Sequence, residues 1–118
     1  MTTTQAIIGS RGEDIAQEWL RSRGYYIVER NWRMGPHEID IIAERYDTMH
    51  FVEVKTRKKG GWQSAYDSID EQKIRTLRHG AMAYRTIHHI RHNIQFDLIA
   101  ITVDERDEIE IDYVENIL

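Results

Sequence analysis

The chain has 118 residues, no cysteine and a formal net charge of −4. The lack of cysteine excludes disulfides, thiolate zinc sites and cysteine nucleophiles, and it suits a reducing compartment. No stretch approaches the roughly 18 apolar residues of a membrane-spanning helix. The opening residues MTTTQAIIGSRGED also lack the features of a signal peptide. We therefore expect one domain, residues 1–118, that is cytoplasmic and makes no contact with a membrane.

Charge is spread unevenly along the chain. Residues 104–118 have a net charge of −6, whereas residues 1–103 have a net charge of +2. Because local clusters govern phosphate binding more than the total charge does, the acidic total does not exclude a nucleic-acid partner. A solvated surface strand explains the acidic segment, and docking of a basic partner protein is a further interpretation.

The first half of the chain predicts a helix followed by three strands. Residues 5–23 have apolar side chains at helical spacing, and Gly24 follows as a helix stop. Residues 25–33, 37–44 and 49–57 are typical of strands, and their short connections predict an antiparallel meander. The alternation in the second strand predicts two faces, one with Ile39, Ile41 and Ala43 and the other with Glu38, Asp40 and Ile42.

The second half predicts a basic loop, a long helix and two strands. The loop covers residues 58–64, and Ser68 or Asp70 caps a helix that extends to about residue 92. Residues 94–103 and 108–114 are typical of strands. Because strand 94–103 follows a long helix, it can join the sheet in parallel through a crossover. The sequence therefore predicts an α/β fold with a mixed sheet of about five strands, a helix on either side, and the order α-β-β-β-α-β-β.

The stretch FVEVKTR (51–57) places two charged side chains in a largely apolar strand. Glu53 and Lys55 are two positions apart, so both point to the same face. Asp40 lies in the preceding strand, and pairing of the two strands would bring its carboxylate to contact distance from Glu53. Two such carboxylates repel each other, and a divalent cation between them removes the conflict. Oxygen ligands suit Mg²⁺ or Mn²⁺, and Lys55 would hold an attacking water or stabilise charge on a phosphate.

Glu13 is a further candidate for this site. It lies in the predicted helix 5–23 at the edge of the apolar stripe, where a carboxylate could point toward the sheet. Its place near a helix start has a second explanation, since acids there interact favourably with the helix dipole. The pattern E-x-K is weak by itself, because Glu and Lys are common on the solvent face of a strand. An acid in the previous strand strengthens the interpretation as a metal site.

Several blocks of the sequence resemble one family of bacterial proteins. In chain order they are G-x-x-G-E-D-x-A-x-x-x-L, GYYIVERNWR, EIDIIA, FVEVKTR and FDLIAI, from about Gly9 to Ile101. They resemble the YraN-type family, which is similar in fold to Holliday-junction resolvases and to the restriction-endonuclease-like PD-(D/E)xK nucleases. One departure is His37, which stands where such proteins usually have glycine and which affects the turn rather than the candidate ligands.

The resemblance implies a site and a reaction. Asp40 and Glu53 would bind Mg²⁺ or Mn²⁺ together with the main-chain carbonyl of Val54, Lys55 would complete the E-x-K signature, and Glu13 would supply a helix-borne acid. The implied activity is metal-dependent endonucleolytic hydrolysis of DNA, with branched DNA as a candidate substrate. The resemblance also implies a symmetric homodimer, because a junction needs two cuts. The alternative is a nucleic-acid-binding module of the same fold with little or no cleavage.

Basic and aromatic residues outside this cluster suggest a DNA-binding surface. Arg57, Lys58 and Lys59 could hold backbone phosphates, and Lys73 would extend the same surface. A plain solvated loop is equally consistent with these residues. The aromatic candidates for base stacking are Trp32 and Trp62, although Trp32 also fits the core.

Two further polar features are a pair of histidines and a single acid in an apolar strand. His88 and His92 have metal-ligand spacing for a helix, but no third ligand is evident, so a polar helix end explains them better. Asp97 is an acid in an otherwise apolar strand. We expect it to pair with an arginine, and Arg30 and Arg33 are the candidates.

Overall fold

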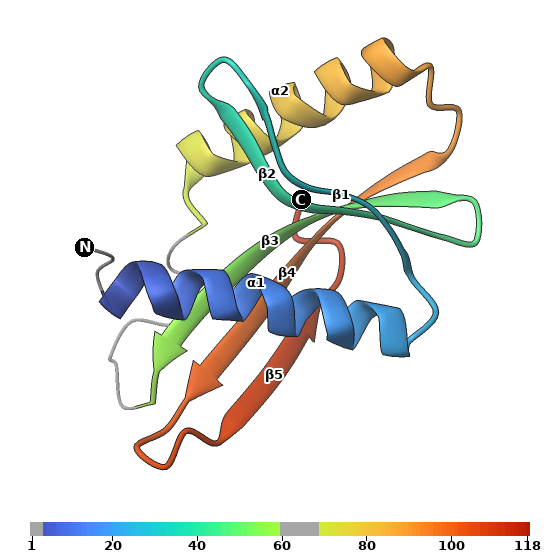
Figure 1. Ribbon diagram of the computed structural model, residues 1–118. Coiled ribbons are helices and arrows are strands. Elements are labelled where there is room, and N and C mark those ends of the chain that lie inside the picture. Colours follow the sequence, from blue (N-terminus) through green and yellow to red (C-terminus); the bar gives the residue numbers. More distant parts are fainter. Residues whose placement is uncertain (1–3, 60–68) are drawn as a thin grey trace.

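The computed structural model describes residues 4–59 and 69–118 (Figure 1). Its elements are α1 (Thr4–Ser22), β1 (Tyr26–Met34), β2 (His37–Arg45), β3 (Thr48–Lys58), α2 (Glu71–His88), β4 (Asn93–Val103) and β5 (Ile109–Val114). The predicted order α-β-β-β-α-β-β is confirmed. Trp62, Ser68 and most of the predicted basic loop lie outside the described residues.

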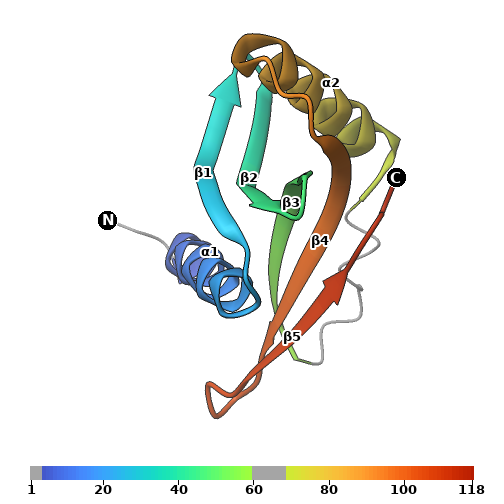
Figure 2. The ribbon, with the colours of Figure 1, turned by 90° about the vertical axis from the view of Figure 1, so that its right-hand side faces the viewer.

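The five strands form one mixed sheet in the order β1-β2-β3-β4-β5. β3 and β4 are parallel, and the other neighbouring pairs are antiparallel. The parallel pair follows from the crossover through α2, as expected for two parallel strands joined by a helix. The view in Figure 2 shows that the sheet twists strongly between the β1–β2 hairpin and the β4–β5 hairpin.

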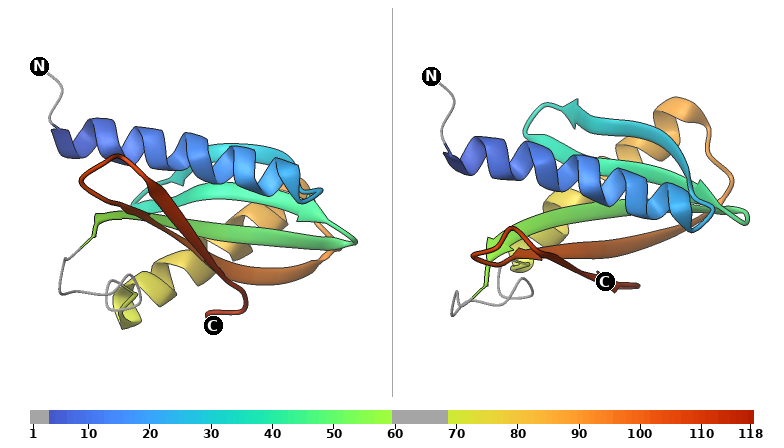
Figure 3. Two further views of the ribbon diagram at one scale, coloured as in Figure 1. Left: turned by 90° about the horizontal axis from the view of Figure 1, so that it is seen from below. Right: turned by 60° about the horizontal axis from the view of Figure 1, so that its bottom comes forward.

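The two helices cover opposite faces of the sheet (Figure 3). The core beneath α1 contains Ala16, Leu20, Tyr25, Ile41, Ala43, Val52, Ile99 and Ile101. The core beneath α2 contains Ile39, Ile42, Met49, Phe51, Ala81 and Tyr84. Trp32 packs against this second core, with its ring edge-on to Tyr84 at 5.3 Å. Neither helix, over the part of the chain that the structure describes, is long and apolar enough to cross a membrane.

A glycine allows α1 to approach β3 closely. Gly12 is buried, and a Cβ atom at this position would lie 1.9 Å from Oγ1 of Thr56. A larger residue therefore fits only if the Thr56 side chain shifts. This contact fixes the helix segment that carries Glu13 directly over the end of β3.

The predicted faces of β2 are partly wrong. Ile41 and Ala43 do share the α1 face, but Ile39 lies on the α2 face together with Ile42. A regular strand would place Ile39 and Ile41 on the same side. The alternation therefore changes at Asp40, the residue between them, and this break is what shapes the candidate site.

The predicted end of the second helix at about residue 92 is also wrong, because α2 ends at His88. Asp70, one of the two predicted caps, is the N-cap, and its side chain accepts a hydrogen bond from the Lys73 N–H at 2.8 Å. His89 adopts a left-handed conformation with φ of 53°, which ends the helix. His92 thus lies beyond the helix, 3.5 Å from Glu44, and its helical spacing from His88 does not exist in the fold.

Asp97 is fully buried in β4, but its predicted arginine partners are wrong. Arg30 pairs with Glu13 and Asp14, and Arg33 pairs with Glu38. The physical reason is strand order, because both arginines lie on β1, which is separated from β4 by two strands. Asp97 instead accepts hydrogen bonds from His50, Gln95, the Tyr113 hydroxyl and the Asn116 N–H. This carboxylate therefore ties β3 and β5 to β4.

Candidate functional site

Asp40 lies where β2 leaves the regular ladder. Pairing of β2 with β3 ends at Ile41. The pairing of β2 with β1 also omits Asp40, which would face Asn31, a residue with a left-handed φ of 52°. In place of a main-chain bond, Asp40 Oδ2 accepts a hydrogen bond from the Val54 N–H at 2.9 Å. The break thus turns the Asp40 carboxylate toward β3.

Glu53 is a buried carboxylate on β3 with two lysines beside it. The residue is 3% exposed, which is unusual for a glutamate. Its Oε1 atom lies 3.2 Å from Lys73 Nζ and 3.9 Å from Lys55 Nζ. Its Oε2 atom is buried and has no hydrogen-bond partner among the described residues. A buried carboxylate oxygen without a partner costs free energy, so a ligand at this position would stabilise the site.

The charge of Glu53 affects the protonation of Asp40. Burial and the nearby charge of Glu53 raise the pKa of Asp40 from 3.8 to about 7, although the Val54 N–H and Lys73 oppose the rise. A pKa in this range means that Asp40 holds a proton for part of the time at neutral pH. The site therefore has an electrostatic conflict that a divalent cation would relieve.

Glu13 reaches the same region from α1. Burial is the main cause that raises its pKa, and a hydrogen bond with the Asn31 side chain lowers it. The charge of Asp40 also raises this pKa. Glu13 Oε2 lies 3.6 Å from the Arg30 guanidinium. The helix-borne acid is thus placed beside Asp40 and is held by partners on β1.

The structure places three of the predicted site residues near one another. Lys55 Nζ lies 3.9 Å from Glu53 Oε1, and Asp40 accepts a hydrogen bond from the main chain of Val54, the residue between them. The carbonyl of Val54 points to the same strand edge as its N–H, which faces Asp40, because both groups of an extended residue share one edge.

Two members of the site escaped sequence reasoning. Lys73 was expected on a separate DNA-binding surface, but it contacts Glu53. Asn31 was not singled out at all. The only signal for Asn31 was its residue type, since asparagine tolerates a left-handed conformation within an irregular strand.

The residues fit a divalent cation that is shared with a substrate. No group of three or more His, Asp or Glu side chains in the described segments is arranged to hold a metal ion alone. Mg²⁺, however, is commonly bound through one or two carboxylates, with waters and substrate phosphates completing its shell. Asp40 and the unpartnered oxygen of Glu53 match such an open site, and their donor atoms are the hard oxygens that Mg²⁺ and Mn²⁺ prefer.

The comparisons with known proteins identify the family. A model described as "Uncharacterised protein family UPF0102" matches residues 12–101, a segment that includes every member of the candidate site. The chain belongs to the UPF0102 family. This confirms the resemblance to YraN-type proteins.

Individual UPF0102 proteins are similar along most of their length. A relative from Flavobacterium psychrophilum is 37% identical over 109 residues, which cover 92% of this chain and 91% of that protein. A relative from Geobacter sulfurreducens is 37% identical over 111 residues, with 93% and 87% covered. One from Persephonella marina is 42% identical over 96 residues, with 80% and 83% covered.

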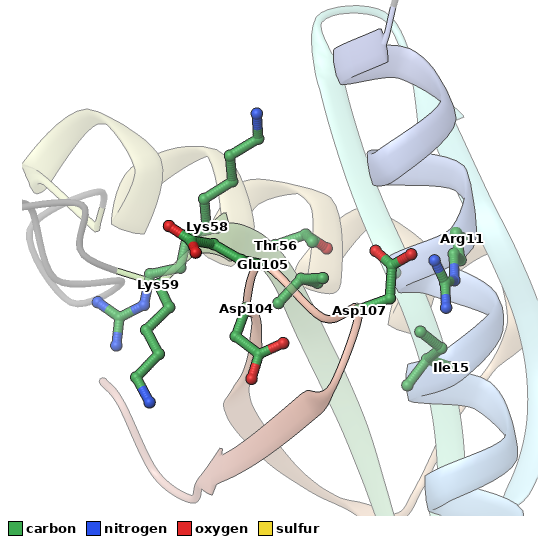
Figure 4. Close-up of a pocket in the computed structure, with 11 residues that line it drawn as sticks. Arg11, Ile15, Thr56, Lys58, Lys59, Asp104, Glu105 and Asp107 are labelled. Carbon is green, nitrogen blue, oxygen red and sulfur yellow. The ribbon is translucent and has the colours of Figure 1, made fainter.

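Three of the residues predicted to bind DNA line a separate cleft of about 470 Å³ in this UPF0102 protein (Figure 4). Arg57, Lys58 and Lys59 come from the end of β3, and Arg11 comes from α1. Acidic residues of the β4–β5 turn line the same cleft, namely Asp104, Glu105 and Asp107. The cleft therefore combines both signs of charge, whereas the predicted surface was basic throughout.

Proposed function

We propose that this UPF0102 protein is a metal-dependent nuclease that hydrolyses phosphodiester bonds of DNA in the cytoplasm, with branched DNA as a candidate substrate. One observation carries the proposal. Asp40, with a pKa raised to about 7, lies beside Glu53, which has a buried oxygen without a partner among the described residues and lysines at 3.2 and 3.9 Å. Perturbed carboxylates with adjacent cations are typical of sites that process charged substrates.

The chain's own residues divide the work as follows. Asp40, Glu53 and the Val54 carbonyl would hold Mg²⁺ or Mn²⁺, which when bound polarises a phosphoryl oxygen and lowers the pKa of water. Lys55 is 40% exposed and lies 3.9 Å from Glu53, so its ammonium can reach both the site and a substrate in solvent. There it would orient the attacking water or stabilise the charge that develops on the phosphate.

Glu13 would support the site from α1. Its carboxylate is held by Arg30 and Asn31 and adds negative potential next to Asp40. That potential favours binding of a cation by the two ligands in β2 and β3. Under this proposal the site depends on docking of α1 as well as on the strands, because Glu13 lies on that helix.

Cleavage assays test the proposal. Labelled duplex, single-stranded and four-way-junction DNA are incubated with Mg²⁺ or Mn²⁺ and with the parent protein, Asp40→Asn, Glu53→Gln or Lys55→Met. We expect each variant to lose a factor of about 10² or more in rate, as for other losses of electrostatic stabilisation. Asp112→Asn is the matched control, since it removes one exposed acid from β5. Parent-like cleavage by Asp40→Asn or Glu53→Gln would refute the assignment.

A DNA-binding module with little or no cleavage is the second candidate. The observation that favours it is the cleft with Arg11, Arg57, Lys58 and Lys59, whose cations could contact phosphates. Under this alternative, DNA binding falls on replacing Lys58 and Lys59 with glutamine and survives Asp40→Asn, with no metal-dependent product. Sedimentation of the protein with a four-way junction also tests the proposed homodimer, since two copies should bind one junction.

A further inference from the structure

Glu53 has two lysine neighbours, and the closer one is not part of the E-x-K pattern. Lys73 Nζ lies 3.2 Å from Glu53 Oε1, whereas Lys55 Nζ lies 3.9 Å away. The Lys73 side chain is 29% exposed and the Glu53 side chain is 3% exposed, so the pair is largely withdrawn from water. Removing one partner from such a pair leaves an uncompensated buried charge, which is strongly destabilising.

Lys73 acts on both candidate metal ligands. Besides its contact with Glu53, its positive charge lowers the pKa of Asp40. The Lys73 ammonium interacts favourably with both carboxylates, so it lies in the region of negative potential that would attract a divalent cation. The ammonium and a metal ion would repel each other, so the presence of one weakens binding of the other.

We propose that Lys73 is an internal counter-ion that occupies the cation site of Asp40 and Glu53 until a divalent metal ion displaces its ammonium. This inference rests on the metal site of the proposed function. Lys73 is then a positioning residue that sets the metal affinity and keeps the two acids compatible with a stable fold when no metal is bound.

The place of Lys73 in the fold permits this exchange. Its main chain is fixed in the first turn of α2, where its N–H donates to the Asp70 side chain. Its side chain has a flexible four-carbon stem and reaches partly into solvent, so the ammonium can withdraw without movement of the helix. Withdrawal takes the closer ammonium away from Oε1 of Glu53, while Oε2 has no hydrogen-bond partner among the described residues.

If Lys73 competes with the metal ion, its removal should raise the metal affinity, whereas removal of a residue that supports the site should lower it. Mn²⁺ is titrated into the parent protein, Lys73→Met and Lys73→Arg by isothermal calorimetry without DNA. We expect Lys73→Met to bind Mn²⁺ about tenfold more tightly or better, because the competing charge is gone. Lys73→Arg should remain near the parent. Arg78→Met, which removes an exposed cation from the same helix, is the matched control for net charge.

Thermal unfolding provides the second readout. In EDTA, Lys73→Met should melt below the parent, because Glu53 loses its counter-ion. Saturating Mn²⁺ should remove that deficit, and the double variant Lys73→Met with Glu53→Gln should melt above Lys73→Met in EDTA.

The outcomes separate this inference from the proposed function. Equal or weaker Mn²⁺ binding by Lys73→Met, with binding retained by the parent, overturns the role of Lys73 and leaves the metal site standing. Binding by Lys73→Met but not by the parent supports the proposal in its strongest form. Absence of Mn²⁺ binding from both proteins overturns displacement of Lys73 by a metal ion, while DNA cleavage then decides the proposed function separately.

Discussion

Replacing Asp40 by asparagine tests the electrostatic account of the site with almost no change in side-chain shape. The asparagine carbonyl can still accept the hydrogen bond that the Val54 N–H donates to Asp40. Its amide group also puts a donor, in place of a second negative charge, beside Glu53. We therefore expect Asp40→Asn to abolish cleavage while it stabilises the folded protein at neutral and alkaline pH, a combination typical of active-site residues.

The size of the stability gain follows from the pKa of Asp40, which is ordinarily 3.8 and is raised to about 7 in the folded protein. Because the raised pKa belongs to the folded state, the folded protein binds a proton that the unfolded chain releases. Stability from this group therefore falls as pH rises from about 4 to about 7, and it is level above that range. At 1.36 kcal/mol per pKa unit, the unfolding free energy lost when Asp40 is fully ionised is about 4 kcal/mol. For a chain of this length, that corresponds to a difference in Tm of roughly 15 °C, which is the upper value for the gain.

Urea unfolding at pH 4.5, 6 and 8 in the presence of EDTA measures this difference. The advantage of Asp40→Asn over the parent should be smallest at pH 4.5 and largest at pH 8. Asp112→Asn serves as the control for removal of one acid from the surface, and its difference from the parent should change little with pH. An Asp40→Asn variant that is no more stable than the parent at pH 8, or whose advantage does not depend on pH, would refute the reasoning.

Two further predictions concern the framework of the site. Asp97→Ala should cost about 3 to 5 kcal/mol of unfolding free energy, because it leaves the buried His50 and the partly buried Tyr113 without their shared acceptor. Urea unfolding that matches the parent would contradict this. Gly12→Ala should destabilise the protein and weaken cleavage, because its Cβ would lie 1.9 Å from Thr56 Oγ1. Adding Thr56→Ala should restore part of the lost Tm, and a double variant no better than Gly12→Ala would show that this contact does not limit helix docking.

The helices, the strands and the main acidic residues could be predicted from the sequence, because the spacing of apolar and charged residues indicates them. The alternation around Glu53 and Lys55 fixed their common face, and the long helix before 94–103 indicated the parallel pairing of β3 with β4. Asp40 bonds to the strand that carries Glu53 and Lys55, since the short β2–β3 connection leaves few possible registers.

The irregular features were not accessible, because they depend on contacts between distant residues. The change of face between Ile39 and Ile41 arises where Asp40 bonds to the main chain of β3, and a period of two cannot represent such a break. The partners of Asp97 depend on strand order rather than on charge, since both candidate arginines lie on β1, which two strands separate from β4. Lys73 reaches Glu53 only because α2 packs over that face, which no local pattern reveals.

The central claim is that Asp40 and Glu53 bind a divalent cation. Measurement of Mn²⁺ binding to the parent, Asp40→Asn and Glu53→Gln is its strictest test. Calorimetric titrations are run with and without a short DNA duplex, and the heat of Mn²⁺ binding to the duplex alone is subtracted. We predict that DNA tightens Mn²⁺ binding, because a phosphate would complete the coordination shell, and that this binding is lost in Asp40→Asn and Glu53→Gln but kept in Asp112→Asn. Equal Mn²⁺ binding by all four proteins would contradict this claim.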